Sequence, residues 1–339
     1  MIILGIESSC DETAAAVCND GIIVSSIVKS QEIHKHYGGV VPEIASREHH
    51  SQINYIVHRA LEAGGYTLKN INSIAVTSGP GLLGSLLVGL NYAKGLSIGL
   101  NIPFIGVNHL QGHLHANYIS SQSIEYPFIC LLVTGGHTQI WEVKQASKYI
   151  LHATTVDDAA GEAFDKGARM LGLDYPGGPE IEKIAQNGDP LSYSFSIPRI
   201  KNNPLDFSFS GIKTAILYKI QGMTENERKK NIANIAASYQ EVIIDTLLDR
   251  LIKVIQKTNI FNISITGGVA ANKRFREKAD VLVKKMNSKL YFPKLEYCTD
   301  NAAMIAIAGY QLLKGGYKSH LNLNANPNLP LDEVSTPLK

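Results

Sequence analysis

The sequence has few of the features of secreted or membrane proteins. Its four cysteines, Cys10, Cys18, Cys130 and Cys298, lie far apart and lack the paired spacing of zinc or redox motifs. No uninterrupted apolar run reaches the roughly 20 residues that a membrane-spanning helix needs. The N-terminal residues also lack the basic and apolar regions of a signal peptide. We therefore expect a reduced, cytoplasmic protein with no membrane segment.

Neither positive nor negative charge is in large excess. The formal net charge of the 339 residues is +2, which is too small to indicate a nucleic-acid-binding protein on charge alone. Hydrophobic residues make up 45% of the chain, an ordinary share for a globular protein and enough for sizeable cores. At a prior of about 150 residues per domain, the length predicts two domains.

The strand pattern predicts an internal duplication. Residues 2–6 form a buried apolar run, residues 7–13 form a turn rich in Ser, Asp, Glu and Thr, and two further strand-like runs follow. Residues 128–155 repeat this order, with the polar turn at 134–138. Two such units in one chain predict two similar α/β domains that face each other across a cleft.

Three turns are suited to binding phosphate groups. The two polar turns offer hydroxyl and backbone N–H groups, and the glycine turn at 267–272 leads from a strand directly into a helix. This glycine turn lacks the spacing of a dinucleotide-binding fingerprint and has no P-loop signature. For the first polar turn, a merely solvated loop is the alternative interpretation.

A pair of histidines after the apolar run 103–107 suggests a metal site. With Asn108 as the N-cap of a helix, His109 and His113 would lie four residues apart on one face. Two imidazoles so placed can hold a transition metal, although they can also contact only water or backbone. A zinc-peptidase pattern requires Glu directly after the first histidine, and Leu110 occupies that position. Asp300, at another helix start, is either a third ligand or an ordinary helix cap.

The motifs taken together closely resemble the bacterial TsaD family of tRNA adenosine threonylcarbamoyltransferases. The match covers nearly the whole chain, in order and spacing. It is carried by residues 5–13 (GIESSCDET), the two histidines at 109 and 113, and residues 132–138 (LVTGGHT), 158–166 (DAAGEAFDK), 175–179 (YPGGP), 207–211 (FSFSG), 267–272 (GGVAAN) and 299–302 (TDNA). Two departures are Gln111 where many relatives have Glu, and Thr134 where Ser is usual.

The resemblance implies an α/β protein with two duplicated domains of the actin, Hsp70 and sugar-kinase (ASKHA) fold around a central cleft. We expect the first domain at residues 1–108 and the second, with helical insertions, at 109–300. The C-terminal segment 301–339 is expected to pack on the first domain.

The resemblance also implies the contents of the cleft. One divalent metal, iron or zinc, would be held by His109, His113 and Asp300. Threonylcarbamoyl-AMP, with ATP or ADP as a further occupant, would be bound by a set of residues on the second domain. This set consists of Leu132, Val133, Thr134, Gly135, Gly136, Asp165, Gly178, Glu182 and Asn272.

The implied reaction transfers the threonylcarbamoyl group to the N6 amine of the adenosine adjacent to the anticodon, in tRNAs that read ANN codons. Asp11 or Glu12 would assist deprotonation of this amine. The implied partners are a TsaB-like paralogue, a TsaE-like ATPase and the anticodon loop of tRNA. Candidate contacts for the tRNA phosphates, with an ordinary basic helix face as the alternative, are Lys273, Arg274, Arg276, Lys278, Lys284 and Lys285.

Two other classes of protein share this fold. A small-molecule kinase would hydrolyse ATP in the presence of its substrate and would leave the histidine pair without a task. A nucleotide-switched assembly protein would associate in a nucleotide-dependent way and would form no modified product. A metal beside the cleft would favour the transferase over both.

Overall fold

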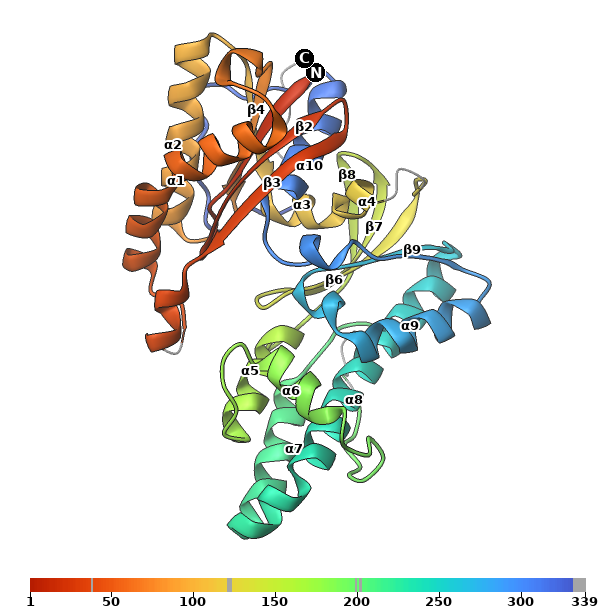
Figure 1. Ribbon diagram of the computed structural model, residues 1–339. Helices are drawn as coiled ribbons and strands as arrows, with labels where there is room; N and C mark the ends of the chain where they lie inside the picture. Colours follow the sequence, from red (N-terminus) through yellow and green to blue (C-terminus); the bar gives the residue numbers. More distant parts are fainter. Residues whose placement is uncertain (38, 121–123, 199, 201–202, 332–339) are drawn as a thin grey trace. The chain divides into compact units, whose positions relative to one another are not determined.

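The computed structural model describes residues 1–37, 39–120, 124–198, 200 and 203–331. These residues form two compact units, which we call unit 1 and unit 2 (Figure 1). Unit 1 comprises Met1–Ile124, Lys144–Tyr149 and the described residues from Pro293 onward, and unit 2 comprises Glu125–Val143 and Ile150–Phe292. No helix among the described residues combines the length and apolar character needed to cross a membrane.

Unit 1 contains a five-stranded sheet in the order β3-β2-β1-β4-β5. The strands β1 (Ile2–Glu7), β2 (Glu12–Asn19) and β3 (Ile22–Ser30) form the antiparallel meander expected from the sequence. The strands β4 (Ser73–Gly79) and β5 (Phe104–Asn108) continue the sheet parallel to β1. The carboxyl ends of β1, β4 and β5 therefore lie at the same edge.

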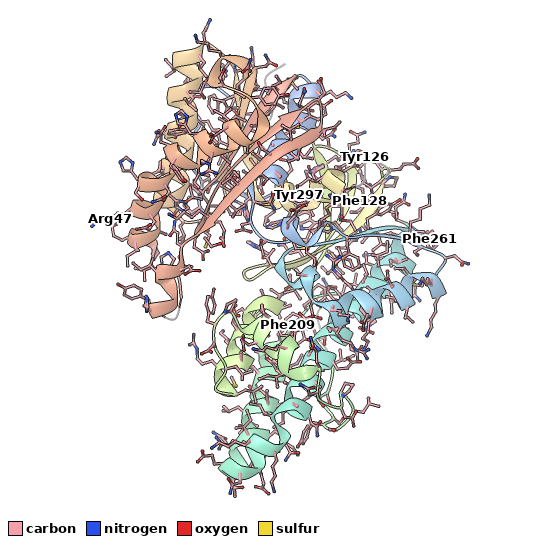
Figure 2. The ribbon with its side chains drawn as sticks, viewed as in Figure 1. Arg47, Tyr126, Phe128, Phe209, Phe261 and Tyr297 are labelled. Carbon is pink, nitrogen blue, oxygen red and sulfur yellow. The ribbon has the colours of Figure 1, made fainter. Side chains whose placement is uncertain are left out.

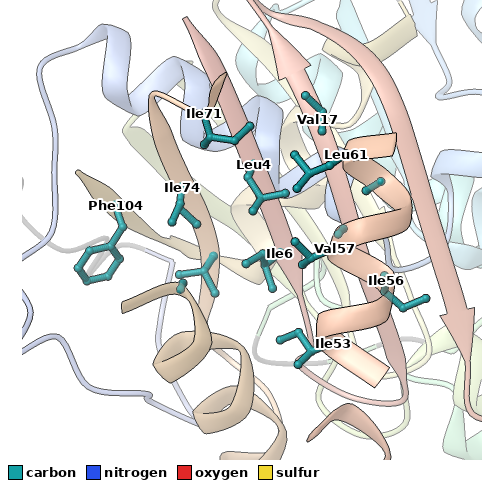
Figure 3. Close-up of a cluster of buried hydrophobic side chains, with 14 of the residues drawn as sticks. Leu4, Ile6, Val17, Ile53, Ile56, Val57, Leu61, Ile71, Ile74 and Phe104 are labelled. Carbon is teal, nitrogen blue, oxygen red and sulfur yellow. The ribbon is translucent and has the colours of Figure 1, made fainter. Parts of the chain in front are cut away.

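Helices cover both faces of this sheet. On one face, α1 (Pro42–Gly64) and α2 (Leu83–Leu100) pack against Leu4, Ile6, Val17 and other apolar side chains (Figure 3). On the other face, the small residues Ala14 and Ala16 admit α10 (Ala302–Lys314). Shorter elements are η1 (Glu32–Tyr37), η2 (Leu68–Asn70), α3 (His109–His115), α4 (Asn117–Ser120) and η4 (Leu295–Tyr297).

Unit 2 repeats the topology of unit 1. Its sheet has the order β10-β9-β6-β7-β8, in which β6 takes the place of β1. The strand β6 pairs antiparallel with β7 and parallel with β9, as β1 pairs with β2 and β4. The strands are β6 (Phe128–Val133), β7 (Thr138–Gln145), β8 (Lys148–Thr154), β9 (Asn262–Thr266) and β10 (Lys289–Tyr291). The predicted duplication is confirmed.

The remaining helices of unit 2 are α5 (Ala160–Met170), α6 (Gly177–Ala185), α7 (Ser210–Gln221), α8 (Glu225–Thr258), η3 (Gly268–Ala271) and α9 (Lys273–Lys285). Phe209, directly before α7, is fully buried among them, and Tyr126 stacks on the buried Phe128 of β6 (Figure 2). The carboxylate of Asp157 accepts hydrogen bonds from the backbone N–H groups of Phe209 and Ser210 and so caps α7. The residue directly before the 158–166 motif thus holds the 207–211 motif in place.

The boundary between the units lies after Ile124, whereas the sequence suggested a boundary after Asn108. The helix α3 packs on α10, where a Cβ at Gly112 would lie 2.8 Å from Cδ1 of Ile305. A side chain at this position would have to displace the end of the Ile305 side chain, so the close approach ties residues 109–115 to α10 of unit 1. The described C-terminal residues are part of unit 1 and pack on its first sheet, since the backbone N–H of Asn326 donates to the carbonyl of Ser78 in β4 over 2.9 Å.

Candidate functional site

The topology of unit 1 gathers polar side chains at one edge of its sheet. Glu7 ends β1, Thr77 lies near the end of β4, and His109 follows β5 directly. Because β1, β4 and β5 are adjacent and parallel, their carboxyl ends bring these three residues together. The Thr77 hydroxyl donates to Glu7 Oε2 over 2.6 Å, and His109 Nδ1 lies 3.1 Å from the same oxygen.

The predicted helix with two histidines is present. The Asn108 side chain accepts a hydrogen bond from the Leu110 N–H over 2.9 Å, which confirms Asn108 as the N-cap of α3. The rings of His109 and His113 lie on one face, edge to face, with centroids 4.8 Å apart. Both side chains are buried. The amide of Asn108 also donates to the carbonyl oxygens of Leu329 and Pro330, so the C-terminal segment holds the start of this helix.

Asp300 completes the cluster. Its Oδ1 lies 3.1 Å from Nε2 of His113 and 3.5 Å from Nε2 of His109. The interpretation of Asp300 as a helix cap is wrong, because Asn301 caps α10 by accepting a hydrogen bond from the Met304 N–H over 2.9 Å. The Asp300 carboxylate instead lies against the two histidines.

The donor set fits a transition metal. One ligand atom from each of His109, His113 and Asp300 lies within 4.8 Å of the others. Two imidazole nitrogens and one carboxylate oxygen are typical protein ligands of iron and zinc. The Asp300 side chain is 23% exposed while both imidazoles are buried, so a further ligand can reach the cluster past the carboxylate. These three residues could hold a metal ion.

Electrostatic interactions shift the protonation of this cluster strongly when no metal is bound. Burial alone would lower the pKa of His109, but the negative charges of Asp300 and Glu7 outweigh it and raise the pKa to about 9. Burial would raise the pKa of Glu7, but the charge and hydrogen bond of His109 outweigh burial and lower it. A proton therefore remains on His109 at neutral pH, where a cation would otherwise bind.

The polar turn of unit 1 lies beside these ligands. Burial, together with the charges of Asp300 and Asp11, raises the pKa of Glu12 to about 9. Ser30 donates to Glu12 Oε1 over 3.4 Å. A third histidine of α3, His115, is not part of the cluster: its Nδ1–H donates to the Gln111 carbonyl, and the group of possible metal ligands among the described residues consists of His109, His113 and Asp300.

The first predicted substrate-binding segment of unit 2 follows β6. Leu132 and Val133 are fully buried strand residues, so only their backbone atoms are available to a ligand. The Thr134 hydroxyl accepts a hydrogen bond from the His137 N–H over 2.9 Å and closes the turn. Gly135 and Gly136 are exposed at its tip.

Neighbouring loops of unit 2 support this turn. A Cβ at Gly161 would lie 2.6 Å from the carbonyl oxygen of Thr134, so only glycine lets the start of α5 approach so closely. Asp165, further along α5, accepts a hydrogen bond from the Gly177 N–H over 2.7 Å at the start of α6. Gly178 follows directly. Burial raises the pKa of Asp165.

Glu182 and Asn272 meet at the start of α9. Glu182 accepts a hydrogen bond from the Lys273 N–H over 2.8 Å, and the Asn272 side chain accepts one from the Phe275 N–H over 2.9 Å. The Asn272 amide also donates to Gln240 Oε1. Both residues therefore cap α9, which gives each a structural task. The structure thus gathers the metal and acidic candidates within unit 1 and the substrate-binding candidates within unit 2.

Half of the cationic candidates for tRNA binding are engaged within unit 2. Arg274 and Lys278 form ion pairs with Glu241 at 2.9 Å and 2.5 Å. The Arg276 guanidinium lies over the Phe292 ring and donates to the Ala270 carbonyl. The alternative of an ordinary helix face therefore fits these three residues. Lys273, Lys284 and Lys285 are exposed.

Sequence reasoning missed the role of Glu7 and Thr77. Glu7 belongs to the first polar turn, yet its contacts depend on which strands lie side by side. The available signal was a charged residue at the end of a buried strand, a position that is unfavourable for a carboxylate without partners.

Structural comparison defines the class of protein. HypF from T. kodakarensis superimposes with a TM-score of 0.63 at 14% identity, over 93% of this chain and 48% of that chain. The Clostridium difficile activator of 2-hydroxyisocaproyl-CoA dehydratase, solved with bound ADPNP, gives a TM-score of 0.52 at 13% identity, over 93% and 97% of the two chains. The protein thus has the duplicated ASKHA fold, and unit 1 carries a cluster that could hold a metal.

Sequence comparison identifies the family. The profile of TsaD, tRNA N6-adenosine threonylcarbamoyltransferase, matches residues 22–307. The Thermosipho africanus enzyme of that name is 50% identical over 332 residues, which cover 98% of this chain and all of that protein. The Clostridium perfringens enzyme is 49% identical over 335 residues and 98% of both chains. The chain belongs to the TsaD family and is a transferase that modifies tRNA.

Proposed function

We propose that this protein transfers the threonylcarbamoyl group from threonylcarbamoyl-AMP to N6 of the adenosine adjacent to the anticodon, in tRNAs that read ANN codons. The observation that carries this proposal is the cluster of His109, His113 and Asp300 at the carboxyl edge of the unit 1 sheet. Neither a small-molecule kinase nor an assembly protein on this fold has a use for such a cluster.

In the proposal, unit 2 binds the adenylate through backbone atoms. The exposed N–H groups of Gly135 and Gly136 bind phosphate oxygens of threonylcarbamoyl-AMP, as N–H groups of glycine turns commonly do. Leu132 and Val133 contribute only backbone, and Asp165, Gly178, Glu182 and Asn272 shape the neighbouring loops. ATP or ADP can use the same loops.

The cluster in unit 1 would hold iron or zinc. Such an ion supplies Lewis acidity and a fixed point of attachment for an oxygen ligand. His109, His113 and Asp300 would provide three protein ligands and leave a further position open. The chain's own contribution is to fix the direction of the two imidazoles and the carboxylate before substrate arrives.

The acidic turn would manage the proton of the reaction. The lone pair of the adenosine N6 amine is delocalised into the ring, so this amine is a weak nucleophile. A C–N bond forms between N6 and the carbamoyl carbon, the bond from that carbon to the AMP phosphate oxygen breaks, and one N6 proton leaves. Glu12, or its neighbour Asp11, takes this proton. Glu12 can take this proton only in its ionised form, and burial with the charges of Asp300 and Asp11 raises its pKa to about 9, so transfer through Glu12 should become faster as the pH rises towards 9.

The anticodon loop presents unpaired bases, so its adenosine can enter a site without duplex melting. Lys273, Lys284 and Lys285 are the candidates for phosphate contacts that remain exposed. A TsaB-like paralogue and a TsaE-like ATPase are the proposed protein partners. The exposed face of α2 supports a protein partner, because Leu83, Leu87 and Ile98 lie uncovered along it in the described part of the chain. A cytoplasmic location stays a prediction.

The proposal is tested by mass spectrometry of tRNA nucleosides from cells depleted of this protein. We expect threonylcarbamoyladenosine to disappear and to return with the wild-type protein but not with His109→Ala. His50→Ala is the matched control, because His50 is an exposed histidine of α1, and it should restore the nucleoside fully. Unchanged nucleoside levels after verified depletion, with no second copy of the gene, would refute the proposal.

A further inference from the structure

Glu7 is the most deeply buried carboxylate at the candidate metal centre. Its residue is 0% exposed. Three donors surround it: the Ser9 N–H lies 2.5 Å from Oε1, and the Thr77 hydroxyl and His109 Nδ1 lie 2.6 Å and 3.1 Å from Oε2. An ionised carboxylate can be buried at acceptable cost only when its oxygens are so satisfied.

The position of Glu7 decides which nitrogen of His109 carries a proton. An ionised carboxylate only accepts hydrogen bonds. If Nδ1 lacked a proton, its lone pair would point at an Oε2 lone pair in a buried site, and the two would repel. The Ser9 hydroxyl, 3.2 Å from Nδ1, could donate to an unprotonated Nδ1, but it cannot remove this repulsion. Nδ1 therefore carries the proton, and the unprotonated nitrogen of neutral His109 is Nε2.

The unprotonated nitrogen of neutral His109, Nε2, is also the one that faces the other candidate metal ligands. Nε2 of His109 lies on the side of Asp300, at 3.5 Å from Oδ1. His113 also turns Nε2 towards Asp300, but its buried Nδ1 has no hydrogen-bond partner among the described residues. Only one of the two histidines is thus held by a carboxylate behind it.

We propose that Glu7 is a positioning residue, which fixes the Nδ1–H tautomer and the ring orientation of His109 so that Nε2 is ready to bind a metal. The inference rests on the proposed metal site and goes beyond it, since Glu7 touches neither metal nor substrate. Thr77 and Ser9 take part by holding the carboxylate in place. Loss of such an outer partner typically costs about 10–100-fold in metal affinity.

Glu7→Gln tests the proposal at constant size. Its amide must place an NH₂ group either against the Ser9 N–H, where two donors clash, or against His109 Nδ1. In the second orientation the amide donates to Nδ1, the Thr77 hydroxyl rotates to accept, and the histidine proton moves to Nε2. The metal then loses a ligand nitrogen although every atom keeps its place.

The experiment uses the full chain with Zn²⁺ alone as the probe. Chelator competition measures the zinc dissociation constant, ¹⁵N NMR of the imidazoles reports the tautomer, and denaturation measures stability without metal. Ser8→Ala is the matched control in the same buried turn, because the Ser8 hydroxyl donates to the Ser85 carbonyl and has no bond to Glu7 or His109 among the described residues. It should lower stability and leave zinc affinity unchanged.

We expect Glu7→Gln to raise the zinc dissociation constant about 10–100-fold and to move the proton of neutral His109 from Nδ1 to Nε2. Equal zinc affinity in Glu7→Gln and wild type would overturn the role of Glu7 and leave the metal site standing. If Glu7→Gln does not fold, the zinc-loaded wild type decides: a proton on His109 Nδ1 supports the inference, and zinc bound at Nδ1 overturns it. Absence of zinc binding to the wild type would overturn both proposals.

Discussion

The two units share one topology and differ in what they present at the carboxyl edge of the sheet. In unit 1 this edge carries charged and titratable side chains, with Glu7 at the end of β1 and His109 directly after β5. In unit 2 the corresponding strand β6 ends in a turn whose tip is Gly135 and Gly136. One copy of the scaffold thus offers side-chain donors and the other offers backbone N–H groups. Duplication allows each copy to specialise while the strand order stays the same.

The largest effect is expected when a metal ligand of unit 1 is removed. Asp300→Ala removes the carboxylate ligand and leaves α10 capped by Asn301. We expect zinc affinity to fall by at least about 100-fold, which exceeds the usual loss for an outer partner, and transfer activity to fall with it. Metal analysis of the purified protein and a transfer assay check this. Normal transfer activity in a metal-free Asp300→Ala protein would show that the reaction does not need the metal.

The next largest effect is expected when the glycine turn of unit 2 is displaced. Gly161→Ala places a methyl group 2.6 Å from the Thr134 carbonyl and must displace the turn at Gly135. We expect a loss of stability of about 1–3 kcal/mol and a raised KM for threonylcarbamoyl-AMP, with zinc affinity unchanged. Gly211→Ala is the control, because a Cβ there meets no atom within 4 Å. A KM at the wild-type value in Gly161→Ala would contradict the role of the turn.

The raised pKa of His109 in unit 1 predicts that the stability of the metal-free protein depends on pH. The pKa of His109 is raised to about 9 in the metal-free folded protein, against an ordinary value of 6.5 for histidine. The folded state binds more protons, so this stabilisation is complete below about pH 6.5 and is lost as the pH rises through about 9. Zinc competes with the same proton, so zinc affinity should rise over this interval.

Urea denaturation of metal-free protein at pH 6.5 and pH 9.5 measures this effect, which we expect to be on the order of 1–3 kcal/mol. Other groups also titrate in this range, so the decisive quantity is the difference from His109→Asn. This variant should show a smaller decrease in stability between the two pH values. An equal decrease in both proteins would show that His109 does not hold the proton.

The smallest expected effects compare two helix caps. Asn108 caps α3 in unit 1 and Asn272 caps α9 in unit 2, and each also donates to a second partner. Substitution by Ala should cost about 1–2 kcal/mol in each case, as measured by chemical denaturation. Only Asn108→Ala should also weaken zinc binding, since α3 carries the histidines. Equal zinc affinity in both variants would show that the Asn108 cap does not contribute to metal binding.

Local patterns explain what could be predicted from the sequence. The first meander, the helix with paired histidines and its cap at Asn108 each depend on residues close together in the chain, and all three are confirmed. The duplicated fold followed from a repeat of strand and turn patterns, which needs no knowledge of distant contacts.

The features that could not be predicted from the sequence depend on contacts between residues far apart in the chain or on small shifts in position. The pairing of Glu7 with His109 requires β4 to lie between β1 and β5, and strand order cannot be read from periodicity. The ion pairs of Arg274 and Lys278 with Glu241 join α9 to α8 across more than 30 residues of sequence. The choice between Asn301 and Asp300 as the cap of α10 depended on a shift of one residue, which propensities do not resolve.

The division of tasks between the units is tested most directly by calorimetric binding of a non-hydrolysable analogue of threonylcarbamoyl-AMP to Asp300→Ala and Gly161→Ala, both prepared without metal. The account predicts that Asp300→Ala binds the analogue as the wild type does and that Gly161→Ala binds it several-fold more weakly. Weaker binding by Asp300→Ala together with wild-type affinity in Gly161→Ala would contradict the assignment of the adenylate to the glycine turn of unit 2.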